Sequence, residues 1–138
     1  IEKWAKKFFL VDDSYNSSPS SLTKALERFN EIHCKGNKIA ILGDMKELGQ
    51  DSLSFHLSMK ENIEKTNIKI IFTIGKFMKK LNQSLSSNVE KKHFNKISDL
   101  EKELKNKLKS DDIILVKGSN SVGLKSLIKN IAGANNDL

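Results

Sequence analysis

Short apolar runs alternate with longer segments of helical periodicity, and this alternation is the feature that most limits how the chain can fold. It is typical of βαβ units, in which parallel strands are joined by helices. Four runs contain few polar residues, so we expect strands that are buried on both faces. They span residues 8–11, 39–42, 70–74 and 113–116, with a weaker strand candidate at 93–94.

Five segments have the periodicity of amphipathic helices, with apolar residues recurring at intervals of three and four. They span residues 20–33, 52–65, 77–85, 98–108 and 124–131. The first should begin right after Pro19, with Ser20 or Ser21 capping its free amide groups. In the fourth, Ser98 precedes the leucine stripe that starts at Leu100.

Residues 1–5 alternate apolar and polar side chains ahead of the first parallel strand, so we expect an antiparallel strand at the sheet edge. The prediction is therefore an α/β chain: one three-layer Rossmann-like domain over residues 1–138, with a mainly parallel six-stranded sheet and one antiparallel edge strand. Because the sequence opens mid-strand without Met, we expect it to be part of a longer protein.

Composition narrows the classes of function. The net charge is +7, but Arg28 is the single arginine and the lysines are scattered without interleaved aromatic residues, which does not favour nucleic acid. Cys34 is the one cysteine, and no apolar run approaches the roughly 20 residues of a membrane span. The three histidines (His33, His56 and His93) lie too far apart for a metal site. We expect a cytoplasmic protein, His56 packed within its helix, and His33 and His93 at the surface or at helix ends.

Three polar loops follow predicted strands, at the edge where open α/β sheets bind ligands. Loop 12–19 reads D-D-S-Y-N-S-S-P and leads directly into a helix. Its residues could bind an anion or a ribose at the helix start, or they could form only a turn and a helix cap. Loop 43–49 reads G-D-M-K-E-L-G. Its Asp44 and Glu47 could hold a substrate ammonium or order a neighbouring loop, or they could be only a capping carboxylate and a solvated one. The third loop begins at Lys117, whose ammonium group could pair with a phosphate or a carboxylate.

The sequence lacks the patterns of a complete nucleotide site. No G-x-G-x-x-G follows the first strand, and no G-x-x-x-x-G-K-[ST] occurs anywhere. Gly75-Lys76, after the third strand, indicates a turn.

The three loop motifs in this order resemble the C-terminal domain of the Mur ligases of bacterial cell-wall synthesis. The motif at residues 43–49 is the most specific, and it is similar to the branch that joins D-alanyl-D-alanine to a UDP-linked muramoyl tripeptide. The resemblance covers nearly the whole chain. It implies an ATP-dependent ligase of three domains, in which ATP phosphorylates the tripeptide carboxylate and the dipeptide amine attacks the acyl phosphate. ATP and Mg²⁺ would be bound mainly by the central domain, and the isolated C-terminal domain would be inactive.

The resemblance also implies residue roles. Asp13 would contact the ATP ribose, and Tyr15, Asn16 and Ser17 would face the nucleotide or the reacting groups. The dipeptide side would be shaped by Asp44, Glu47, Lys117, Ser119 and Asn120. No residue of this chain is expected to be catalytic by itself or to bind a metal.

Two residues depart from the family pattern. Ser18 stands where many members have Asn, which leaves a shorter hydrogen-bonding side chain. Asn120 stands where Arg is common, so the guanidinium that would clamp a carboxylate is absent. Two other functions stay open from the residues: a stand-alone Rossmann-like module that binds a nucleotide or a partner, and a basic nucleic-acid binder, which would show strong salt dependence.

Overall fold

The computed structural model describes residues 8–12, 18–46, 48–86, 88–119 and 123–136. In this part of the chain a five-stranded sheet has the order β1-β5-β2-β3-β4, and every pair of neighbouring strands is parallel. The strands are β1 (Phe8–Asp12), β2 (Lys38–Gly43), β3 (Ile70–Ile74), β4 (Glu90–Phe94) and β5 (Asp112–Lys117). The helices are α1 (Pro19–Glu31), the 3₁₀ turn η1 (Gly49–Asp51), α2 (Ser52–Leu57), α3 (Lys60–Glu64), α4 (Lys76–Ser84), α5 (Ile97–Lys107) and α6 (Leu124–Asn136).

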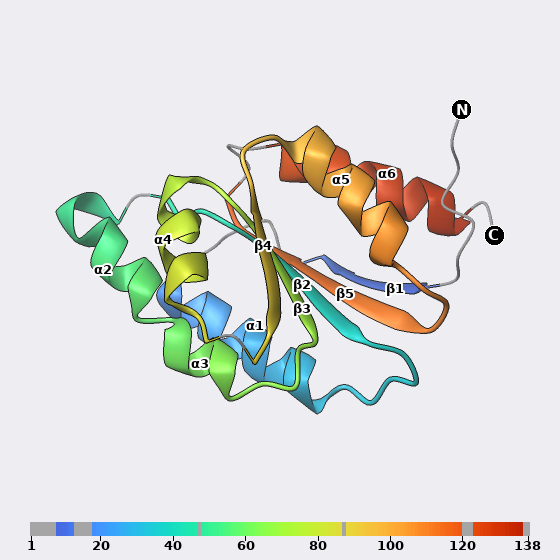
Figure 1. The fold of residues 1–138 in the computed structure, drawn as a ribbon, viewed down its shortest axis with the longest axis horizontal. Helices are drawn as coiled ribbons and strands as arrows, with labels where there is room; N and C mark the ends of the chain where they lie inside the picture. The colour runs from blue at the N-terminus through green and yellow to red at the C-terminus, as the bar shows by residue number, and fades with distance from the viewer. Residues whose placement is uncertain (1–7, 13–17, 47, 87, 120–122, 137–138) are drawn as a thin grey trace.

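Helices cover both faces of the sheet, which gives the three layers that the sequence predicts (Figure 1). On one face α1, α3 and α4 pack against the strands through one apolar cluster, with Leu26 and Phe29 of α1 among its members. On the other face α5 and α6 form a second cluster, in which Phe72 and Phe94 meet edge to face at 5.2 Å between ring centroids. Helices thus leave the strands on opposite faces, as right-handed crossovers require when the chain returns from β4 to β5.

The predicted burial of the strands is confirmed for β2, β3 and β5, whose residues are all buried. The side chains of β1 lie outside the described part of the chain. The predicted antiparallel edge strand at residues 1–5 also lies outside it. Among the described helices none is both long and apolar enough to cross a membrane.

Helix α1 begins one residue earlier than predicted, and its cap is a different serine. Ser18 is the N-cap and Pro19 occupies the first turn, where a missing N–H costs nothing. The Ser18 hydroxyl accepts from the Ser21 amide at 3.2 Å, and the Ser21 hydroxyl accepts from the Ser18 amide at 2.9 Å. This reciprocal pair is a capping box, so the expected caps at Ser20 or Ser21 are corrected to Ser18.

The single helix predicted over residues 52–65 is wrong, because the structure divides it into α2 and α3. In a continuous helix the Phe55 carbonyl would accept from the Met59 amide. Here the Ser58 hydroxyl donates to that carbonyl at 2.6 Å, and the Met59 amide turns to the His56 carbonyl at 3.2 Å. A local serine hydroxyl therefore competes with the helical ladder and ends α2.

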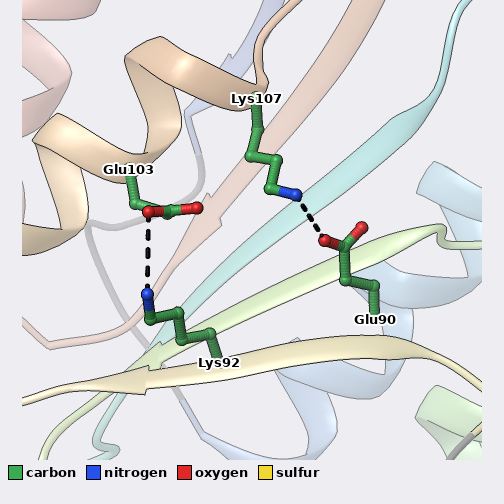
Figure 2. A network of polar contacts seen from close by, with 4 residues as sticks. All are labelled: Glu90, Lys92, Glu103 and Lys107. Carbon is green, nitrogen blue, oxygen red and sulfur yellow. Dashed lines mark ion pairs between the residues drawn. The ribbon is translucent and has the colours of Figure 1, made fainter.

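Strand β4 extends over five residues, beyond the two that the sequence indicated. Its first four residues are charged or polar and only Phe94 is buried, so its sequence lacks an apolar run. Helix α5 lies on the face of the second apolar cluster and contributes two ion pairs to β4 (Figure 2). Glu90 accepts from Lys107 at 2.7 Å, and Glu103 lies 3.6 Å from Lys92. All four side chains reach solvent, so these pairs add little stability.

Other helix boundaries shift by one or two residues, except at α6, which extends past the predicted end at 131 to Asn136. Helix α5 begins at Ile97, one residue earlier than predicted, and its N-cap residue Lys96 makes no side-chain cap. Ser98 lies in the first turn, ahead of the leucine stripe as expected.

At the amino edge of the sheet, the Asp112 carboxylate fastens two loops to the start of β5. One oxygen accepts from the Asn37 amide and the other from the Lys109 amide, both at 2.8 Å. Asp112 is only 2% exposed. A Cβ at Gly36 would lie 2.5 Å from this carboxylate, so the close approach requires glycine.

We expect Asp112→Ala to lower the free energy of unfolding by about 2–4 kcal/mol, because two backbone amides lose the buried carboxylate that accepts from them. Urea unfolding of the purified chain measures this. Asp111→Asn is the matched control: Asp111 is exposed with φ 71°, a region that Asn tolerates, so the expected change is below about 0.5 kcal/mol. Equal midpoints for the two variants would contradict the fastening role of Asp112.

Candidate functional site

The carboxyl ends of β1, β5 and β2 meet at one edge of the sheet. Asp12 is opposite Val116, and Leu42 is opposite Lys117. Helix α6, which follows β5, lies on the face opposite α1, which follows β1. Open α/β sheets bind ligands where neighbouring strands send their loops to opposite faces. The structure therefore places Asp44, Lys117 and Ser119 in one region, whereas residues 13–17, Glu47 and Asn120 lie outside the described part of the chain.

The Asp44 side chain caps helix α4, which is one of the two readings that the sequence left open. Its carboxylate accepts from the Met78 amide at 2.8 Å and from the Phe77 amide at 3.3 Å. Gly75, the N-cap residue, has φ 109° and no side chain with which to cap the helix. The expected turn at Gly75-Lys76 is thus the start of α4. Whether Asp44 also meets a substrate ammonium stays a prediction.

The loops after β2 and β5 are joined through their backbones. The Ser119 amide donates to the Asp44 carbonyl at 2.9 Å. A Cβ at Gly118 would lie 2.7 Å from the Gly43 Cα, so the two glycines let these backbones approach closely. The loop after β2 is anchored further by the buried Met45 side chain. The two loops therefore form one connected structure at the carboxyl edge.

Lys117 is the last residue of β5 and is 2% exposed. It takes part in at least one polar, ionic or ring interaction within the chain. The predicted pairing of Lys117 with a phosphate or carboxylate stays a prediction.

A second polar cluster near this edge, between β3, β4 and α4, was not predicted. Thr73 Oγ1 and His93 Nδ1 share a hydrogen bond of 2.8 Å, and Asn82 Nδ2 donates to Thr73 Oγ1 at 2.9 Å. His93 is half-buried within the edge strand β4, so it still reaches the surface but does not lie at a helix end. His33 is exposed, as expected. Burial lowers the pKa of His93 below 6.5; Lys79 lowers it further, and Asp44 has a smaller, opposing effect.

The described residues at this edge are suited to binding and positioning. No group of three or more His, Cys, Asp or Glu side chains in the described residues is arranged to hold a metal. The Thr73 hydroxyl is fully buried, so it is not placed to attack a substrate. A cavity of about 430 Å³ lies at the amino edge around Ile32, Cys34 and Ile113, and no predicted site residue lines it.

We expect Gly75→Ala to lower the free energy of unfolding by about 3 kcal/mol, because its Cβ would lie 2.4 Å from the Asp44 carboxyl group at a φ that only glycine favours. Gly49→Ala is the matched control, since Gly49 has φ 69° but nothing within 4 Å of the added Cβ. It should cost about 1 kcal/mol. Thermal and urea unfolding of the two glycine variants, and of the double variant Gly75→Ala/Asp44→Ala, measure the cost of the clash. Equal stability of the two glycine variants would contradict the clash.

We expect the imidazole of His93 to titrate below pH 6.5 in the folded chain. Lys79→Met should raise its pKa and Asp44→Asn should lower it, because the first removes a repelling charge and the second an attracting one. Since the folded pKa is depressed, the stability linked to His93 is present above 6.5 and is lost as the pH falls through the folded-state pKa. NMR titration of the imidazole protons measures this, and shifts of the opposite sign in both variants would contradict the assigned causes.

Comparison with known proteins agrees with this architecture. The family model described as "Mur ligase, glutamate ligase domain" matches residues 2–120. Among curated relatives, the UDP-N-acetylmuramoyl-tripeptide--D-alanyl-D-alanine ligase of Bacillus subtilis is 30% identical over 125 residues, covering 88% of this chain and 27% of the relative. The ligase of the same name from Buchnera aphidicola subsp. Baizongia pistaciae is 34% identical over 124 residues, covering 88% and 26%. The chain thus spans about a quarter of the length of these relatives.

Solved structures show the same fold. The crystal structure of MurF ligase from Thermotoga maritima in complex with ADP aligns with a TM-score of 0.74 and 24% identity, covering 99% of this chain and 30% of that one. A MurF structure from Acinetobacter baumannii aligns with a TM-score of 0.77 and 20% identity, covering 96% and 29%. The family match spans the sheet and all three loops of the carboxyl edge. The chain therefore belongs to the Mur ligase family, as a glutamate ligase domain.

Proposed function

We propose that residues 1–138 are the C-terminal domain of a cytoplasmic ATP-dependent ligase that joins D-alanyl-D-alanine to UDP-N-acetylmuramoyl-tripeptide. The tripeptide carboxylate would first be phosphorylated by ATP, and the dipeptide amine would then attack the acyl phosphate and release phosphate. Relatives with this activity in their names cover most of this chain, and their remaining length would supply the N-terminal and central domains. The completed sheet would include the antiparallel edge strand expected at residues 1–5.

The observation that supports the proposal is that the carboxyl ends of β1, β5 and β2 lie side by side at one edge of a parallel sheet, where the three polar loops begin. These are the loops whose sequences resemble the ligase branch. In the proposed enzyme, Asp13 contacts the ATP ribose, and Tyr15, Asn16 and Ser17 face the nucleotide or the reacting groups. Lys117, Ser119 and Asn120 shape the dipeptide side together with Asp44 and Glu47 nearby.

The described residues fit a domain that completes a nucleotide site held mainly by another domain. They contain no cluster suited to a divalent cation, and the sequence has no phosphate-binding loop of the G-x-x-x-x-G-K-[ST] type. Mg²⁺ and the ATP phosphates would therefore be held on the central domain. The part of this chain would be to bring its carboxyl edge against them, which orders the reacting groups and limits water.

We expect phosphate release by the full-length protein to require ATP, UDP-N-acetylmuramoyl-tripeptide and D-alanyl-D-alanine together, in the presence of Mg²⁺. Asp13→Ala should reduce kcat/KM by at least about tenfold, because a carboxylate that orients the nucleotide is lost. The 138-residue chain alone should release no phosphate and bind ATP weakly or not at all. A coupled phosphate assay with each substrate omitted in turn measures the requirement.

Asp99→Ala, at an exposed position on α5, is the control and should match the wild type. No release by a folded, magnesium-supplied full-length protein would rule out the ligase and favour a Rossmann-like binding module. Tight ATP binding by the 138-residue chain alone would show that the nucleotide site is largely contained here, against the proposal.

A further inference from the structure

The peptide group between Asp44 and Met45 is held on both sides. Its carbonyl accepts from the Ser119 amide at 2.9 Å, and its N–H donates to His56 Nε2, also at 2.9 Å. The first bond reaches the loop after β5, and the second reaches α2. One peptide plane in the loop after β2 therefore connects two elements that lie far apart in the sequence.

The tautomer of His56 follows from these bonds. Because Nε2 accepts from the Met45 amide, the ring proton must lie on Nδ1, which donates to the Ser52 carbonyl at 2.6 Å. The bonds run in one direction, from the Ser119 amide through the peptide group and the imidazole to Ser52. Hydrogen bonds in such a chain polarise and strengthen one another, especially away from water.

The imidazole is also held by contacts outside its bond to the loop. His56 is fully buried, and its ring stacks on Phe77 of α4 with centroids 5.0 Å apart and planes 28° apart. Phe77 is also one of the two residues whose amides donate to the Asp44 carboxylate. The imidazole therefore rests on α2 and α4, and its Nε2 atom is presented to the loop from that support.

We propose that His56 is a positioning residue for the carboxyl-edge site. By fixing the Asp44–Met45 peptide plane, it keeps the Asp44 carbonyl on the Ser119 amide and holds the loops after β2 and β5 as a unit. In this scheme His56 affects the site only through the main chain, because its hydrogen bond is to the Met45 amide and not to a predicted site side chain. The consequence for catalysis rests on the proposed ligase function, whereas the structural link does not.

The first test uses the unmodified 138-residue chain. NMR should show a proton on His56 Nδ1 and a scalar coupling across the N–H···N hydrogen bond between the Met45 amide nitrogen and His56 Nε2. A proton on Nε2, or no coupling at a resolved Met45 amide, would overturn the proposal. This measurement does not depend on any variant folding.

The second test compares His56→Leu with His56→Gln by hydrogen exchange. Leu removes the acceptor, so the Ser119 amide should exchange at least about tenfold faster, beyond any change at Ile71 and Phe72 of β3, which report overall stability. Gln retains an oxygen near the position of Nε2 and should restore most of the protection. Phe77→Leu is the matched control, because it removes the ring stack and leaves both hydrogen bonds. Equal acceleration at Ser119 and in β3 would overturn the proposal.

The third test uses the full-length protein in the phosphate assay. His56→Leu should raise the KM for D-alanyl-D-alanine about tenfold with a much smaller change in the KM for ATP, and His56→Gln should recover most of the difference. Parallel loss of both parameters would overturn the catalytic part of the proposal. If the wild type releases no phosphate, the ligase function fails, and the NMR and exchange tests still decide the role of His56.

Discussion

The insertion of β5 between β1 and β2 is the constraint on which the rest of the structure depends. The last strand in the chain pairs with the first and the second, so the centre of the sheet forms only when residues a hundred positions apart meet. All six residues of β5 are buried, and they supply apolar surface to both faces of the sheet. The carboxyl end of β5 therefore lies between those of β1 and β2. Contacts between residues so far apart in the sequence form slowly, because the chain loses the entropy of closing a long loop before these contacts stabilise the fold.

The sequence was sufficient to predict most of the architecture because the central strands and the helices have strong periodic signals. β3 matches its predicted limits, and β2 and β5 extend only one residue beyond each end. The failures have local causes. The break between α2 and α3 depends on one hydroxyl that competes for the Phe55 carbonyl, which no pattern of apolar residues reveals. Most of β4 was missed because only Phe94 of this strand is buried, so the strand has no apolar run for a sequence pattern to detect.

The sequence was sufficient to predict where the candidate site lies, but not which partner each of its residues contacts. Polar loops after parallel strands must meet at one edge, and the structure brings Asp44, Lys117 and Ser119 there. Their partners are set by tertiary structure: the Asp44 carboxylate caps a helix that begins more than thirty residues later, and the Ser119 amide reaches the Asp44 carbonyl. His56 was expected to be packed, and it is fully buried, but its bond to Met45 arises only when α2 folds back beside the loop. The roles predicted for residues 13–17, Glu47 and Asn120 stay predictions.

The polar character of β4 has a consequence for how copies of this protein meet. In the described sheet β4 has a neighbour on one side only, so its outer backbone amides and carbonyls form an open template for another strand. Glu90, Lys91 and Lys92 follow one another along it, and the mixed charges would need to be desolvated if a second copy added its own edge. A strand that was difficult to recognise for lack of apolar residues is for the same reason a poor seed for intermolecular sheet growth, which keeps the sheet edge from nucleating aggregates at high protein concentration.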